Sequence, residues 1–210
     1  MNNIVVHVLK TSRRLQAFED KIKSETSAAI KDVCKLLPVS NIDIAVSDNP
    51  SGAIPHLGIG GYAPNAHLIY ISIDPSFKPL STPIREIKRT LSHELHHCLR
   101  WTNPGYGTTL LEAIITEGLA DYFELQITKR PPQRWSVALD KNELNKWLSK
   151  AKAEFNNKQY DHNEWFYGSK RIPKWTGYSL GYYMVGEYLE KHPERSAATL
   201  YSTPASQFLI

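Results

Sequence analysis

The stretch that decides the fold runs from Pro83 to Trp101 and reads PIREIKRTLSHELHHCLRW. Apolar residues recur along it at steps of three and four, which is the period of an α-helix with one buried side. The members of this stripe are Ile84, Ile87, Leu91, Leu95 and Cys98. The sequence therefore predicts one helix over 83–101, with its apolar side in a core and its polar side in a cleft.

The polar side of this helix carries the pattern HExxH at residues 93–97. His93 and His97 are one helical turn apart, so both imidazoles project from the same face and can bind one Zn²⁺ ion. Glu94, at the next position round the helix, is suited to take a proton from a zinc-activated water. The pattern predicts two metal ligands and a general base.

A second helix is predicted from about Thr109 to Thr128, because Thr109-Leu110-Leu111-Glu112 matches a capping box. Glu117 and Asp121 are one turn apart on it and share a face. We expect Glu117 to be the third metal ligand, with the fourth position open for water as in catalytic zinc sites. We expect Asp121 to accept the second ring N–H of a ligating histidine. The alternative is that both are solvated acids of an amphipathic helix.

Together these patterns resemble those of the gluzincin metallopeptidases, in which HExxH is followed by a Glu ligand within an ExxxD sequence on the next helix. The separation of His97 from Glu117 is similar to that in the thermolysin group. The segments HELHHCLRW (93–101) and LLEAIITEGLADYFE (110–124) look like those of small bacterial proteins described only as predicted zinc-dependent proteases. This resemblance is dense over 58–125 and 173–190, and it implies a zinc peptidase that takes a peptide or protein substrate.

Two other families with HExxH fit the chain less well. The metzincins need Gly where Arg100 stands and a third His where Asn103 stands. Peptide deformylase needs an upstream cysteine in a glycine-flanked motif, whereas Cys34 falls in a predicted amphipathic helix. Both cysteines, Cys34 and Cys98, are expected to be reduced core residues.

The sequence Tyr178-Ser179-Leu180-Gly181 resembles the Tyr-x-x-Gly sequence of the aminopeptidase branch of the gluzincins. In that branch the tyrosine hydroxyl binds the oxyanion, so the resemblance implies this catalytic role for Tyr178, with Tyr182 as second choice. The chain lacks the Gly-x-Met-Glu-Asn sequence by which those enzymes anchor a free N-terminus. An endopeptidase is therefore favoured over an exopeptidase.

The formal net charge of +4 on 210 residues is unevenly spread. Region 129–175 holds eleven Lys or Arg and five Asp or Glu, a net +6, and four of the five tryptophans. Such a mixture can bind single-stranded nucleic acid. An ordinary apolar helical stripe over 144–155 explains the aromatics better, so no nucleic-acid partner is expected.

The sequence says less about cellular location and oligomeric state. No stretch reaches the eighteen or more apolar residues of a membrane span. The first nine residues are too short for a secretory signal. We expect a cytoplasmic protein, and its oligomeric state stays open.

The remaining pattern predicts strands at 3–9 and 42–46, a hairpin at 58–73, and helices at 12–37 and 177–191. We expect an α+β fold, a single zincin-like domain over 1–210. Residues 1–128 would hold a mixed sheet, the zinc helix and the Glu-ligand helix, and 129–210 a helical subdomain, with the active-site cleft between them. By resemblance, 58–63 would carry the substrate as an added strand; the alternative is a glycine-rich turn.

The predicted function is peptide hydrolysis by a zinc-dependent endopeptidase. Zinc would activate water, and Glu94 would carry the proton to the leaving amine. The alternative is a zinc-containing peptide-binding or holdase stress protein on the same scaffold. Glu94 favours the enzyme, because a pure binding module has no use for a base beside the metal.

Overall fold

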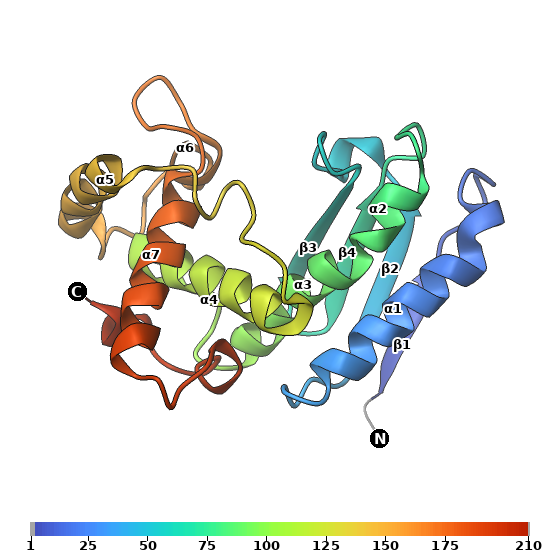
Figure 1. Ribbon diagram of the computed structural model, residues 1–210, viewed down its shortest axis with the longest axis horizontal. Coiled ribbons are helices and arrows are strands. Elements are labelled where there is room, and N and C mark those ends of the chain that lie inside the picture. The colour runs from blue at the N-terminus through green and yellow to red at the C-terminus, as the bar shows by residue number, and fades with distance from the viewer. Residues whose placement is uncertain (1–2, 210) are drawn as a thin grey trace. The chain divides into compact units, whose positions relative to one another are not determined.

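The structure is a computed structural model that describes residues 3–209 and has an α+β fold, as predicted (Figure 1). The chain forms two compact units, residues 1–102 and 103–210. The N-terminal unit contains the sheet and the HExxH helix, and the C-terminal unit contains the helix of Glu117. The arrangement of the whole chain as one domain with a subdivision at residue 128 stays a prediction.

A four-stranded mixed sheet forms the centre of the N-terminal unit. Its strands are β1 (Ile4–Val8), β2 (Ile42–Asp48), β3 (Ile59–Asn65) and β4 (Leu68–Ile73). They lie in the order β1-β2-β4-β3, with β1, β2 and β4 parallel and β3 antiparallel to β4. The predicted hairpin is confirmed, and its first strand lies at an edge of the sheet.

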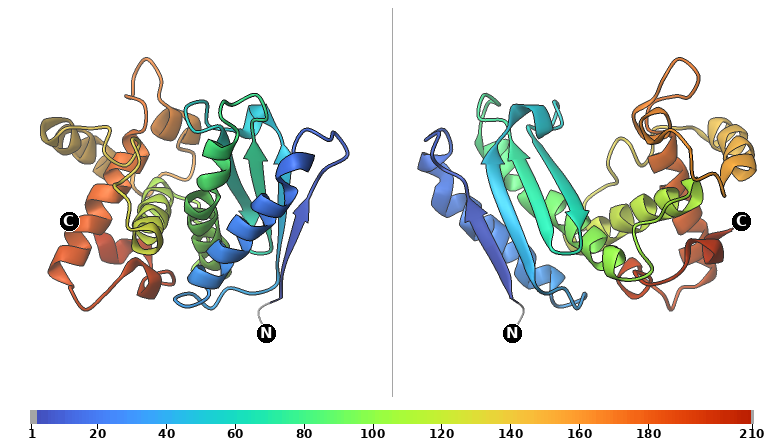
Figure 2. Two further views of the ribbon diagram at one scale, coloured as in Figure 1. Left: turned by 45° about the vertical axis from the view of Figure 1, so that its right-hand side comes forward. Right: turned by 180° about the vertical axis from the view of Figure 1, so that it is seen from behind.

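Helices cover one face of this sheet (Figures 1 and 2). They are α1 (Glu19–Val33), α2 (Ser81–Arg85) and α3 (Ile87–Thr102). The prediction of one continuous helix from Pro83 is wrong at its first turn, because the N–H of Glu86 bonds to the carbonyl of Pro83, only three residues back, at 3.1 Å. The prediction for 12–37 is also wrong at its start, since Arg13 has a left-handed φ of 64°.

The core of the N-terminal unit forms between α3, α1 and the buried face of the sheet. All five residues of the predicted stripe are at most 1% exposed. They are Ile84, Ile87, Leu91, Leu95 and Cys98. The stripe prediction is therefore confirmed, and it determines which way the polar side of α3 turns.

The C-terminal unit is built on four helices. They are α4 (Leu110–Thr128), α5 (Lys141–Glu154), α6 (His162–Tyr167) and α7 (Thr176–Lys191). The predicted capping box begins α4: the Thr109 side chain accepts from the N–H of Glu112 at 3.3 Å, and the Glu112 carboxylate accepts from the N–H of Thr109 at 2.9 Å. No helix within residues 3–209 has the length and apolar character needed to cross a bilayer.

Two glycines let α4 and α7 cross closely. A Cβ atom on Gly118 would lie 2.3 Å from the carbonyl carbon of Gly181, and one on Gly181 would lie 2.2 Å from the oxygen of Ile114. The obstacle is backbone in both cases, so it cannot move aside as a side chain can. The glycine of the Tyr178-x-x-Gly181 sequence therefore has a packing role.

The aromatic residues of the basic region include core residues. Trp147 and Trp165 are 5% and 3% exposed, and their rings meet edge to face with centroids 6.2 Å apart. The Nζ of Lys150 lies 4.3 Å from the centroid of the Trp147 ring. This packing matches the apolar stripe predicted for 144–155.

Candidate active site

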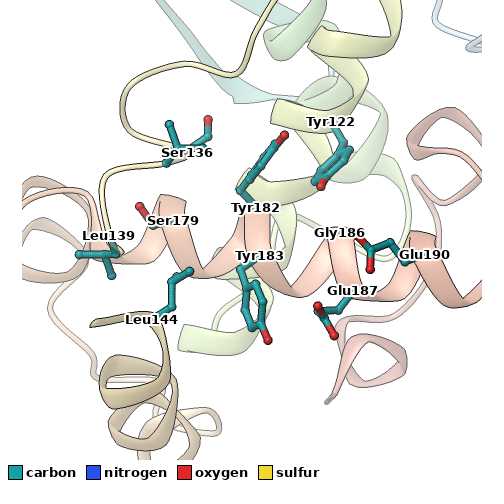
Figure 3. A pocket seen from close by; sticks show the side chains of 11 residues that line it. Tyr122, Ser136, Leu139, Leu144, Ser179, Tyr182, Tyr183, Gly186, Glu187 and Glu190 are labelled. Atoms are coloured by element: carbon teal, nitrogen blue, oxygen red, sulfur yellow. The ribbon is translucent and has the colours of Figure 1, made fainter. Parts of the chain in front are cut away.

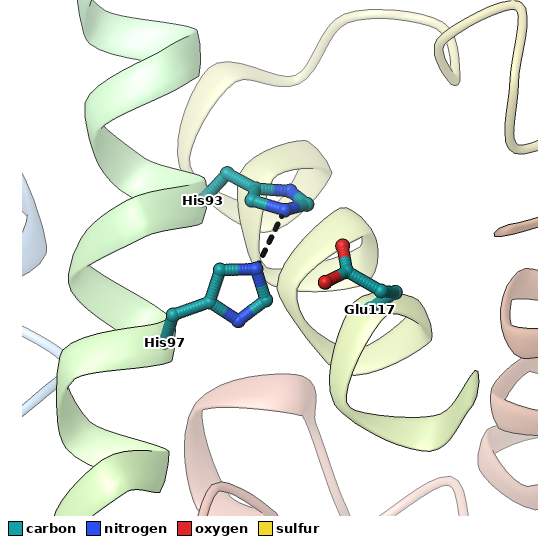
Figure 4. Close-up of side chains that lie close together, drawn as sticks. All are labelled: His93, His97 and Glu117. Atoms are coloured by element: carbon teal, nitrogen blue, oxygen red, sulfur yellow. Dashed lines mark hydrogen bonds between the residues drawn. The ribbon is translucent and has the colours of Figure 1, made fainter. Parts of the chain in front are cut away.

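His93 and His97 present the same ring nitrogen to the same point. Their Nε2 atoms are 2.9 Å apart, and the rings are nearly perpendicular at 87° (Figure 4). Two nitrogen ligands of a tetrahedral zinc, each about 2.0–2.1 Å from the ion, lie roughly 3.3 Å apart. The pair is therefore within a few tenths of an ångström of the separation that one ion requires.

Glu94 extends from the same helix toward the edge strand β3. A Cβ atom on Gly61 would lie 2.5 Å from the Cγ of Glu94 and 2.6 Å from its Oε1. The Glu94 carboxylate therefore occupies the space that any larger residue at position 61 would need. Because Gly61 has no side chain, the predicted general base Glu94 can lie directly beside β3.

The backbone of β3 also has a defined direction at Gly61. The carbonyl of Ile59 accepts from the N–H of Ile54 at 3.0 Å, and that of Ala63 accepts from Trp101 Nε1 at 3.0 Å, so both face away from β4. Backbone groups alternate in direction along a strand, so those of Gly61 also face outward. An edge strand with outward groups can accept an additional strand.

Glu117 lies on α4 and is only 5% exposed. Its Oε1 accepts a hydrogen bond from the hydroxyl of Tyr106, in the segment before α4. The negative charge of Glu117 also raises the pKa of Tyr160 and opposes the lowering of the pKa of His162, although burial is the main cause of both shifts. Glu117 is thus a buried carboxylate that accepts a hydrogen bond from one tyrosine hydroxyl and whose charge affects the pKa of two further side chains.

Tyr178, on α7, belongs to the same surroundings. Burial is the main reason why the pKa of its hydroxyl is raised well above the usual value, and the charge of Glu117 raises it further. Its ring meets that of Phe166 edge to face, with centroids 5.0 Å apart. Its hydroxyl also shares a hydrogen bond with Tyr167, which raises the pKa as well. A hydroxyl that stays protonated can act as a hydrogen-bond donor at neutral pH.

Tyr182, the second choice for the oxyanion role, lies in a different environment. It stacks on Tyr122 with centroids 4.5 Å apart, and the two hydroxyls share a hydrogen bond. Figure 3 shows both rings beside a pocket of about 230 Å³ whose lining does not include Tyr178. The Tyr182 hydroxyl is therefore already engaged in a hydrogen bond with Tyr122.

Asp121 is 2% exposed and anchors the segment after α4. Its two carboxylate oxygens accept from Trp135 Nε1 at 3.2 Å and from the Ser136 hydroxyl at 2.7 Å. Ser179, next to Tyr178, donates to the carbonyl of Trp135 at 2.8 Å. These bonds assign Asp121 a structural role, and its predicted bond to a ligating histidine stays a prediction.

The chemistry of the donors fits zinc. Two imidazoles with one carboxylate are a ligand set of catalytic zinc. His93 and His97 supply the two imidazoles from one helix. Glu117 belongs to the other compact unit, and its role as the third ligand stays a prediction.

Sequence reasoning missed three residues around Glu117. Tyr106 lies in a short loop and has no periodic partner, although the flanking Gly105 and Gly107 mark an unusual backbone there. Tyr160 and His162 lie before and in the short helix α6, and they are linked by a hydrogen bond of 3.2 Å. Nothing in the spacing of these three residues along the sequence indicates that each interacts with the Glu117 carboxylate.

Comparison with known proteins places the chain among predicted enzymes. The family described as "Predicted Zn-dependent protease (DUF2268)" matches residues 22–210. A protein of Bacillus subtilis (strain 168) named "Uncharacterized protein YjaZ" is 28% identical over 148 residues, which are 67% of this chain and 54% of that protein. The chain thus spans about half the length of this relative. No solved structure matches the chain.

Proposed function

The chain belongs to the DUF2268 family of predicted Zn-dependent proteases, and on that basis we propose that it is an endopeptidase that cleaves peptide bonds at a zinc ion. One observation carries the proposal: the Nε2 atoms of His93 and His97 converge, while Glu94 of the same helix reaches the edge strand at Gly61. This arrangement supports a metal site that has a base and a strand edge beside it. A cytoplasmic location is part of this proposal.

His93, His97 and Glu117 are the proposed ligands. The bound ion would polarise the substrate carbonyl and lower the pKa of a coordinated water to about 7. The buried carboxylate of Glu117 suits this role, because a cation offsets the cost of keeping its charge away from water. Asp121 is proposed to orient a ligating histidine by accepting its other N–H.

The peptide is proposed to add to β3 as a further strand. The outward N–H and C=O of Gly61 would pair with one substrate residue, and the neighbouring carbonyl would then lie near Glu94. Glu94 takes the proton of the attacking water and passes it to the leaving amine. The Tyr178 hydroxyl donates to the oxygen that becomes negative in the transition state.

The decisive experiment measures cleavage of a proteome-derived peptide library by the full chain, with and without zinc. We expect internal cleavage that a chelator abolishes and zinc restores. Glu94→Gln is the matched control, since it retains the shape of the site and removes the base. Its turnover should fall by about 10²–10⁴-fold while its zinc content stays at that of the wild type.

Two outcomes would contradict the proposal. A wild-type protein that binds zinc and library peptides but cleaves none would indicate the alternative, a zinc-containing peptide-binding protein. A Glu94→Gln protein that cleaves as fast as the wild type would show that another group is the base.

A further inference from the structure

Tyr106 makes a specific contact with one oxygen of the proposed ligand Glu117. The Tyr106 hydroxyl donates a hydrogen bond to Oε1 of the Glu117 carboxylate. Both residues belong to the C-terminal unit, so the contact exists within a single compact part of the chain. A buried carboxylate with one oxygen engaged has far fewer orientations than a free one.

The backbone around Tyr106 holds its ring in place. Gly105 and Gly107 have φ values of 110° and 113°, which other residues rarely adopt. The hydroxyl of Thr116, the residue before Glu117, donates to the carbonyl of Tyr106 at 2.8 Å. The Glu112 carboxylate accepts from the N–H of Thr108 at 2.8 Å. The segment is therefore fastened to the first turns of α4.

We propose that Tyr106 is a positioning residue that orients the Glu117 carboxylate for zinc. The inference rests on the proposed function, in which Glu117 is a ligand. It predicts a role in metal affinity, because removing an outer partner of a metal ligand typically weakens binding by about 10–100-fold. Tyr106 differs in this from Tyr178, which would act on the substrate.

The test is zinc affinity of the full chain, measured by competition with a chromophoric chelator. Tyr106→Phe removes one hydroxyl and little volume, and we expect its Kd for zinc to rise about 10–100-fold. Far-UV circular dichroism of the metal-free variant should match that of the wild type, so that a weaker zinc affinity reports the metal site and not a loss of fold. Tyr182→Phe, the matched control, should bind zinc like the wild type, because the Tyr182 hydroxyl pairs with Tyr122 and not with Glu117.

A parallel Glu117→Gln variant separates the two proposals. If Glu117→Gln binds zinc as tightly as the wild type, Glu117 is not a ligand and the proposed metal site fails. If Glu117→Gln loses zinc and Tyr106→Phe does not, the site stands and the positioning role of Tyr106 is overturned. Adding Tyr106→Phe to Glu117→Gln should cause little further loss, because both changes act on one carboxylate.

Discussion

In the N-terminal unit a glycine makes room for a side chain, whereas in the C-terminal unit glycines make room for a backbone. The space beside Gly61 is filled by the end of the Glu94 side chain, at 2.5 Å from where a Cβ would lie. The space beside Gly118 is filled by the backbone of Gly181, at 2.3 Å. A side chain can rotate away from an added methyl group, but a helix has to shift as a whole.

The two units should therefore respond differently to change. At Gly61, an added methyl group should displace the carboxylate of Glu94, the proposed base, and leave the fold intact. In the C-terminal unit, the same change separates the helices that carry Glu117 and Tyr178. Removing one hydroxyl of the C-terminal unit, that of Tyr178, should by contrast affect the chemistry alone.

Tyr178→Phe should reduce kcat by about 10²–10³-fold, since the hydroxyl is proposed to bind the developing oxyanion. KM should change far less than kcat, because the bond forms mainly in the transition state. Steady-state kinetics on a cleaved library peptide measures both. Tyr182→Phe is the control and should be nearly silent, because its hydroxyl pairs with Tyr122. If Tyr182→Phe lowers kcat by this factor instead, the oxyanion role belongs to Tyr182.

Gly61→Ala should reduce kcat/KM by about 10²-fold, the cost of displacing a catalytic group by roughly 1 Å. Stability should change little, because alanine lowers the entropy cost of ordering this strand residue. If Gly61 acts through Glu94, adding Gly61→Ala to the Glu94→Gln protein should cause little further loss of kcat/KM. A large added loss in the double variant would show that residue 61 acts directly on the substrate instead.

Gly118→Ala should lower the free energy of unfolding by about 1–3 kcal/mol, as overpacking of a tight contact does. Tryptophan fluorescence during urea unfolding reports this unit, since four of the five tryptophans lie in it. Gly186→Ala on α7 is the matched control: the atoms nearest to its Cβ belong to the Tyr122 side chain, whose hydroxyl would lie 2.4 Å away. It should be neutral or stabilising by up to about 1 kcal/mol. Equal stabilities for the two variants would show that a backbone neighbour costs no more than a side-chain neighbour does.

Prediction from sequence succeeded where the signal is local. The stripe of α3, the capping box of α4 and the hairpin of β3 and β4 each depend on residues within one element or in neighbouring ones. It failed at the break at Glu86 and at the start of α1, where a three-residue turn and a left-handed residue interrupt a continuous apolar period. Periodicity indicates which residues are buried, but it does not locate such interruptions.

The sequence by itself determined two of the proposed ligands and the base, because His93, Glu94 and His97 are brought together by the pitch of a single helix. Only the tertiary structure decided that Gly61 makes room for Glu94 and that Tyr106 bonds to Glu117. These contacts join separate elements through one missing methyl group or one hydroxyl. Such contacts depend on how the elements pack against one another, and this packing produces no periodic pattern in the sequence.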